Sequence, residues 1–216
     1  IILPVTVLVS LWISKVLSTR GKKINAFAKA VFYLPSVTNQ VALVIVWNFL
    51  FSPAFGLVAS IFRILKLDPI SWFDSPVTAI PLLALLICTY GLGQPVILYT
   101  AAINGIPDCY FEAARIDGAT ENQIFFSITL RLLHGTTTYI LITSTIGMLQ
   151  IFAVPYLMTN GGPSFRTSTL LMLVYTSAFQ NGSFGYASAI GVVLFFITAA
   201  IAFIQFRMMR QDAIEY

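Results

Sequence analysis

Apolar stretches follow one another along this chain and are separated by short polar segments. Residues 30–62, 75–107, 132–165 and 167–206 contain no Asp, Glu, Lys or Arg. A helix that crosses the hydrocarbon core of a bilayer needs about 20 predominantly apolar residues. The pattern therefore predicts an all-α polytopic transmembrane helical bundle with about five spans. We expect them at residues 1–14, 33–51, 77–103, 137–157 and 186–206.

The first of these spans is shorter than the others. The chain begins with Ile rather than Met, and no charged segment precedes the apolar run. A cleaved signal peptide would have a charged start and a cleavage site of small residues. We therefore expect either a transmembrane domain that fills residues 1–216 and lacks its N-terminal span, or a disordered N-terminus.

The composition agrees with a membrane protein. Hydrophobic residues make up 58% of the chain and charged residues 9%, and the mean hydropathy is +0.88. Soluble domains carry about 25% charged residues. A domain of 216 residues could hardly bury such long uncharged helices in a soluble core.

The distribution of basic residues predicts the orientation of the chain. Loops on the cytoplasmic side of a membrane are enriched in Lys and Arg. Nine basic residues fall in one set of loops: Lys15, Arg20, Lys22, Lys23, Lys29, Arg115, Arg131, Arg207 and Arg210. Three fall in the other set: Arg63, Lys66 and Arg166. We therefore expect a multi-pass protein of the cell membrane, with the first set of loops and the C-terminus in the cytoplasm. This topology explains the net positive charge, so a nucleic-acid partner is not needed to account for it.

Residues 105–130 connect the third and fourth predicted spans and contain a cluster of charges. Glu112, Arg115 and Asp117 lie within six residues of one another. Ordinary connections are about 4–6 residues long, so a simple solvated turn is the weaker interpretation. Such a cluster in a chain with few charges indicates a docking surface for a cytoplasmic partner.

The same loop carries the signals of two helices joined by a glycine. Pro107 suits the first turn of a helix because it lacks a backbone N–H. Gly118 can adopt a left-handed conformation and end that helix. Thr120 and Gln123 have the spacing of a capping box for the next helix. We expect Tyr110, Ala113, Ala114 and Asp117 to share one face, where the two alanines allow a partner to approach closely.

The run from Glu112 to Gly118 resembles the EAA loop of permease subunits in binding-protein-dependent ABC importers. Further segments resemble the carbohydrate-type permeases of the maltose and glycerol-phosphate group: residues 32–35 (Phe-Tyr-Leu-Pro), 46–51 (Val-Trp-Asn-Phe-Leu-Phe), 158–163 (Met-Thr-Asn-Gly-Gly-Pro) and 184–189 (Phe-Gly-Tyr-Ala-Ser-Ala). The family commonly has Pro where this chain has Arg131. That difference puts the local bend in question, because Pro starts or kinks a helix.

The resemblance implies a type I ABC importer permease fold and a set of partners. It implies two ATPase subunits that bind ATP and Mg, a second permease subunit that is a different chain, and an extracytoplasmic solute-binding protein. This chain itself would hold no cofactor. The positions that correspond to the coupling surface are Glu112, Ala113, Arg115, Asp117 and Gly118.

Polar residues inside the third and fourth predicted spans are candidates for a substrate path, because polar groups in hydrocarbon are costly and often functional. The candidates are Tyr90, Gly91, Gln94, Ser144, Gly147 and Gln150. Corresponding stretches line the sugar site in the maltose permease that this chain resembles. The alternative is that these residues only pack helices and form interhelical hydrogen bonds.

Several other functions lack the residues that they need. The sequence has no Walker A motif, no carboxylate in the predicted spans and a single His, His134. Cys88 and Cys109 lie in a predicted span and a cytoplasmic loop, where a disulfide is not expected. We therefore expect neither a catalytic residue nor a metal site. A sugar or polyol permease is the leading hypothesis; an osmolyte permease, a membrane enzyme and a scaffold are the alternatives.

Overall fold

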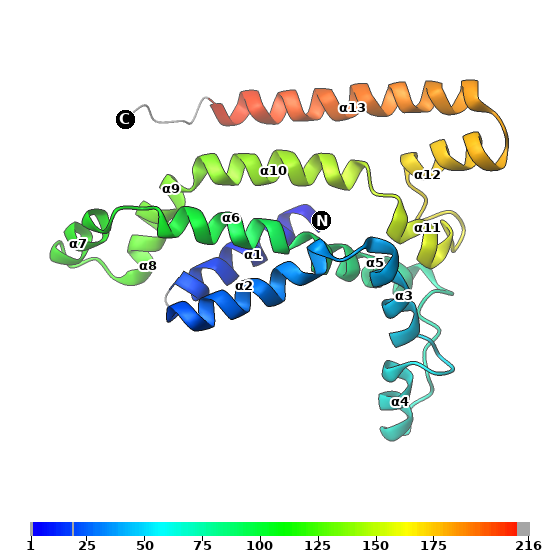
Figure 1. The fold of residues 1–216 in the computed structure, drawn as a ribbon, viewed down its shortest axis with the longest axis horizontal. Helices are drawn as coiled ribbons and strands as arrows, with labels where there is room; N and C mark the ends of the chain where they lie inside the picture. Colours follow the sequence, from blue (N-terminus) through cyan, green and yellow to red (C-terminus); the bar gives the residue numbers. More distant parts are fainter. Residues whose placement is uncertain (1, 19, 211–216) are drawn as a thin grey trace. The chain divides into compact units, whose positions relative to one another are not determined.

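The computed structural model describes residues 2–18 and 20–210, and within them every regular element is helical (Figure 1). The first helices are α1 (Ile2–Ser18), α2 (Lys22–Val37), α3 (Gln40–Leu50), α4 (Leu57–Ile64), α5 (Pro76–Gly91) and α6 (Gly93–Asn104). They are followed by α7 (Asp108–Ile116), α8 (Glu121–Ile124), the π-helical segment η1 (Phe125–Thr129), α9 (Leu130–Leu132) and α10 (His134–Leu149). The last are α11 (Ala153–Thr159), α12 (Leu170–Tyr175), the π-helical segment η2 (Thr176–Gln180) and α13 (Phe184–Arg210). The predicted all-α class is confirmed.

The described residues include up to four candidate spans, against about five predicted. Two helical stretches are long and apolar enough to cross a membrane alone, His134–Thr159 and Phe184–Met208. Two more count if each bent pair, α2 with α3 and α5 with α6, is one span. The remaining predicted span corresponds to α1, which has 17 residues and is shorter than the roughly 20 that a span needs.

Each of the two bent pairs has a break between its helices, and local chemistry explains each break. Between α2 and α3, the Asn39 side chain accepts a hydrogen bond from the Val41 N–H at 2.8 Å and caps a new helix. Between α5 and α6, the helix stops at Leu92, and Pro95 lies in the next turn. Proline cannot donate the backbone hydrogen bond that a continuous helix requires.

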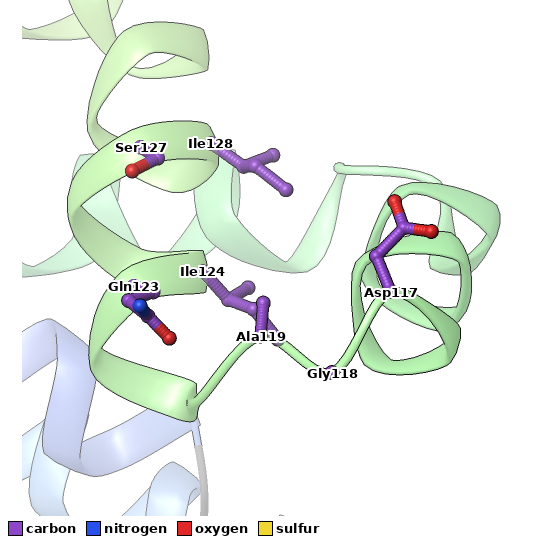
Figure 2. Close-up of a pocket in the computed structure, with 7 residues that line it drawn as sticks. All are labelled: Asp117, Gly118, Ala119, Gln123, Ile124, Ser127 and Ile128. Carbon is purple, nitrogen blue, oxygen red and sulfur yellow. The ribbon is translucent and has the colours of Figure 1, made fainter.

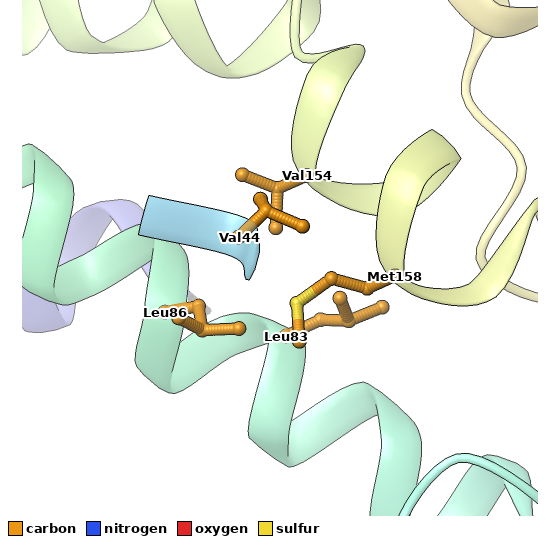
Figure 3. Packing of buried hydrophobic residues seen from close by; sticks show 5 residues of the cluster. All are labelled: Val44, Leu83, Leu86, Val154 and Met158. Carbon is orange, nitrogen blue, oxygen red and sulfur yellow. The ribbon is translucent and has the colours of Figure 1, made fainter. Parts of the chain in front are cut away.

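The chain divides into two compact units, each of which we describe by itself. The described part of the first unit contains residues 2–36, 89–145 and 201–210, and the second contains residues 37–88 and 146–200. In the second unit, five buried apolar side chains from α3, α5 and α11 form the core shown in Figure 3: Val44, Leu83, Leu86, Val154 and Met158.

In the first unit, α1 packs against α6 through small polar residues. Thr6, Ser10 and Ser14 recur every four residues and are buried. The Ser14 hydroxyl donates to the Val96 carbonyl oxygen at 3.1 Å and accepts from the Thr100 hydroxyl at 3.3 Å. Lipid provides no hydrophobic force between helices, so small residues that allow close approach, with hydrogen bonds between helices, hold such pairs together.

Helix α2 also lies close to α6. An added Cβ at Gly93 would come within 2.8 Å of the Phe32 carbonyl oxygen, so only glycine fits at this crossing. Ala28 and Phe32 of α2 pack on a buried cluster formed by Ile13, Leu17 and Val96. This cluster joins the C-terminal part of α1 to the first turn of α6, and α6 leads directly into the charged loop.

Candidate functional site

The predicted pair of helices joined by a glycine is present in the structure. Helix α7 begins after Pro107 and ends at Ile116 with Asp117 as its C-cap, and Gly118 has a φ of +79°. The Gly118 N–H donates to the Arg115 carbonyl at 3.1 Å, and the Ala119 N–H donates to the Ala114 carbonyl at 3.0 Å. These two bonds form a complete Schellman motif, which ends a helix with a left-handed glycine.

The start of the next helix is fixed in the predicted manner. The Thr120 hydroxyl accepts from the Gln123 N–H at 3.4 Å, and the Gln123 side-chain oxygen accepts from the Thr120 N–H at 2.8 Å. This capping box satisfies two N–H groups at the start of α8. Helices α7 and α8 with their Gly118–Thr120 turn therefore form a defined unit, which we call the coupling block.

An ion pair crosses the turn of the coupling block. The Arg115 Nε lies 3.1 Å from the Glu121 Oε1, with 59% and 72% of these side chains exposed. An exposed pair contributes only about 0–1 kcal/mol. The pair therefore orients α8 relative to α7 more than it stabilises them.

The proposed coupling residues are accessible. Glu112, Ala113, Arg115, Asp117 and Gly118 are all exposed. Among the described residues, the Glu112 carboxylate has neither a hydrogen bond nor an ion pair. It is therefore free to meet a partner.

The expected docking face needs one correction. We predicted that Ala113 and Ala114 both line it, but Ala114 is only 8% exposed. Successive residues of a helix are rotated by about 100°, so two adjacent alanines cannot both point directly outward. Ala114 faces the chain itself, and Ala113 remains available on the outer side.

A small pocket lies beside the glycine turn (Figure 2). Its volume is about 310 Å³, and Asp117, Gly118, Ala119, Gln123, Ile124, Ser127 and Ile128 line it. The Asp117 carboxylate stands on the α7 side and Gln123 and Ser127 on the opposite side. Ile124 and Ile128 add apolar surface, so the pocket can accept a partner side chain with an apolar stem and a polar or cationic end.

The residues predicted for the substrate path are divided between the two units. Tyr90, Gly91, Gln94 and Ser144 belong to the first unit, and Gly147 and Gln150 to the second. Gln94, Gly147 and Gln150 are exposed, and the other three are half-buried. Their assembly around one path stays a prediction.

Comparison with known proteins identifies the family. Residues 6–211 match the family model described as "Binding-protein-dependent transport system inner membrane component". The chain belongs to this family. It is accordingly an inner-membrane transport permease component and not an enzyme.

Individual relatives agree with this assignment. The permease is 31% identical over 191 residues to the probable ABC transporter permease protein YurN of Bacillus subtilis, covering 88% of this chain and 65% of the relative. It is 34% identical over 168 residues to the sulfoquinovosyl glycerol transport system permease protein SmoG of Agrobacterium fabrum, covering 78% and 54%. The chain thus spans about half to two thirds of the length of these relatives.

The fold is also that of a solved transporter. A bacterial ABC transporter involved in the import of the acidic polysaccharide alginate matches with a TM-score of 0.86 and 22% identity, over 98% of this chain and 73% of that chain. This confirms the predicted importer permease fold. Arg131, where the family commonly has Pro, is exposed in α9 of this permease, and the helix is still interrupted at Leu133.

Two polar side chains of the permease escaped the sequence analysis as site candidates. The Gln205 amide of α13 donates to the Thr145 hydroxyl of α10 at 2.9 Å, in the first unit. The sequence signal that could have indicated this contact is a single Gln within the last apolar stretch. Lys15 bonds to the coupling block, but its sequence position indicated only a cytoplasmic charge, because a contact 107 residues away leaves no local pattern.

Proposed function

We propose that this chain is one permease subunit of an ATP-driven importer for a sugar, an oligosaccharide or a related polyol compound. It forms half of the translocation path and couples to a separate ATPase through the coupling block. The observation that carries the proposal is the block itself: two short helices locked by a Schellman motif and a capping box, with an unpaired exposed Glu112. A rigid block can transmit a displacement, whereas a flexible loop would absorb it.

The solute class is supported by relatives and by residue chemistry. The named transport system of SmoG carries sulfoquinovosyl glycerol, and the solved transporter with the same fold imports alginate. Neutral hydrogen-bonding side chains such as Gln94 and Gln150 suit hydroxyl-rich solutes. An osmolyte remains the alternative solute. Uptake measurements with a set of sugars and a set of osmolytes distinguish the two classes.

The partners follow from the same proposal. Two ATPase subunits bind ATP and Mg and seat the coupling block. A second permease subunit completes the path, and an extracytoplasmic solute-binding protein delivers the solute. The test is reconstitution of these chains in proteoliposomes, with solute uptake and ATP hydrolysis measured together. Uptake that does not depend on ATP, or the absence of any ATPase association, would contradict the proposal.

The orientation of the chain is tested by cysteine labelling. We expect Gly162→Cys, which lies between α11 and α12, to react with an impermeant thiol reagent added outside the cell. Gly21→Cys, between α1 and α2, should react only after the membrane is opened, because the basic residues favour a cytoplasmic location for that turn. Both variants are made in a Cys88→Ser, Cys109→Ser background, since those two thiols are free. The reverse labelling pattern would reject the orientation and the coupling role with it.

The substrate path is tested by removing its amides. We expect Gln94→Leu and Gln150→Leu each to reduce uptake about two- to tenfold, which corresponds to the loss of one hydrogen bond of roughly 0.5–1.5 kcal/mol. Ser144→Ala should have a smaller effect, because a helical serine can instead bond to its own backbone. Uptake of several solutes is measured and normalised to the amount of assembled complex. A changed preference among solutes supports contact, whereas equal loss for all of them with poor assembly indicates helix packing only.

A further inference from the structure

The coupling block is joined to α1 through the side chain of Lys15. The Lys15 Nζ donates to the Asn122 Oδ1 of α8 at 3.1 Å. The same ammonium group lies 4.2 Å from the centroid of the Phe125 ring and 5.5 Å from that of Phe126. Both distances are within the range of a cation–π attraction. One cation therefore holds three residues of the loop.

These contacts fall on a boundary in the backbone. Helix α8 ends at Ile124, and η1 continues from Phe125 with π-helical hydrogen bonding. A π-helical turn holds one more residue than an α-helical turn and is common at functional sites. It can absorb a displacement by changing its register. Lys15 contacts residues on both sides of this boundary, so its side chain connects both α8 and the start of η1 to α1.

The surroundings make this contact important. A cavity of about 560 Å³ lies between the C-terminal end of α1 and the coupling block, and Lys15, Ser18, Asp108, Arg115 and Glu121 are among its lining residues. Van der Waals contact across such a space is limited, so a side chain that bridges it carries a large share of the interaction. Lys15 is such a side chain.

We propose that Lys15 is a positioning residue for coupling. It holds the α8–η1 boundary to α1, so that a displacement of the coupling block moves α1 instead of being absorbed in η1. Because Ser14 of α1 bonds to Val96 of α6, the displacement reaches the helix that carries Gln94. The inference rests on the proposed function, in which the ATPase moves the coupling block.

The test uses the complete transporter with its ATPase, second permease and binding protein. The measured quantity is the factor by which solute-loaded binding protein stimulates ATP hydrolysis. We expect Lys15→Met to lower this factor about fivefold, the low end of coupling between distant sites, with unchanged basal hydrolysis and assembly. Lys15→Arg, which keeps both the hydrogen bond and the cation over the ring, should restore it. Lys23→Met removes an exposed cation from α2 and serves as the matched control, with normal stimulation.

The outcomes separate this inference from the proposed function. An unmodified transporter without any stimulation contradicts the proposed function. Normal stimulation in the wild type and equally in Lys15→Met overturns the role of Lys15. Failure of Lys15→Arg to restore stimulation also overturns it, because arginine keeps the cation and the hydrogen-bond donor on which the proposed role depends. If Lys15→Met does not assemble, Phe125→Leu must show the same loss of stimulation, and a normal value there rejects the inference.

Discussion

Replacing Gly118 with Val is expected to reduce solute uptake to background while the chain still inserts into the membrane. Gly118 has a φ of +79°, a left-handed conformation that costs an L-residue roughly 1–2 kcal/mol and a β-branched one more. The added Cβ would meet no atom within 4 Å, so the effect comes from the backbone and not from a clash. A relaxed backbone would break the Schellman motif and change the angle between α7 and α8. Uptake and ATPase association at equal membrane abundance measure the result.

Two matched variants isolate the cause of this loss. Gly118→Asn should retain most of the uptake, because asparagine tolerates the left-handed region. Gly135→Val adds the same side chain at an exposed glycine of α10 that is equally uncrowded but has an ordinary backbone conformation. We expect at most a small effect there. If Gly118→Val transported as well as Gly135→Val, the angle between the two helices would not matter for coupling.

Local sequence signals predicted the coupling block well because each of its parts is specified within a few residues. The glycine at the end of α7 and the Thr120–Gln123 capping box depend on neighbouring residues only, so the pattern and the structure agree. The burial of Ala114 was not predicted. It depends on which side of α7 faces the rest of the chain, and sequence spacing leaves that side open.

The breaks in the spans and the contacts between distant helices were harder to predict. Hydropathy alone finds an apolar stretch but not the point where a helix stops inside it, so it does not locate the breaks near residues 39 and 92, after which α3 and α6 begin. The π-helical segments follow from backbone register and have no composition signal. The link between Lys15 and Asn122 joins residues that are far apart in the sequence. Such contacts require the packed structure.

The electrostatics of the coupling block lead to a second large effect. The Arg115 guanidinium is already engaged by Glu121, and Asp117 lines the pocket beside the glycine turn. Glu112 differs from Arg115 because its exposed carboxylate has no partner among the described residues, and it differs from Asp117 because it is not a lining residue of that pocket. Under the proposed function, this carboxylate meets a donor or a cation when the ATPase binds, so its charge should act on association rather than on the fold of this chain.

Glu112→Lys is therefore expected to weaken association with the ATPase by about 30-fold or more, while the isolated permease remains inserted and helical. Removing one member of a hydrogen-bonded charge pair that is buried in an interface costs roughly 2–5 kcal/mol, and a like charge placed there adds repulsion. Glu112→Gln, which keeps the shape and loses the charge, should have a smaller effect. Asp68→Lys reverses an exposed charge in the loop after α4 and should bind the ATPase normally. The measurement is the dissociation constant of the detergent-solubilised permease complex for the ATPase at low and high salt. The defect should shrink at high salt because salt screens exposed charges, and equal affinity for Glu112→Lys and the wild type at low salt would remove Glu112 from the docking surface.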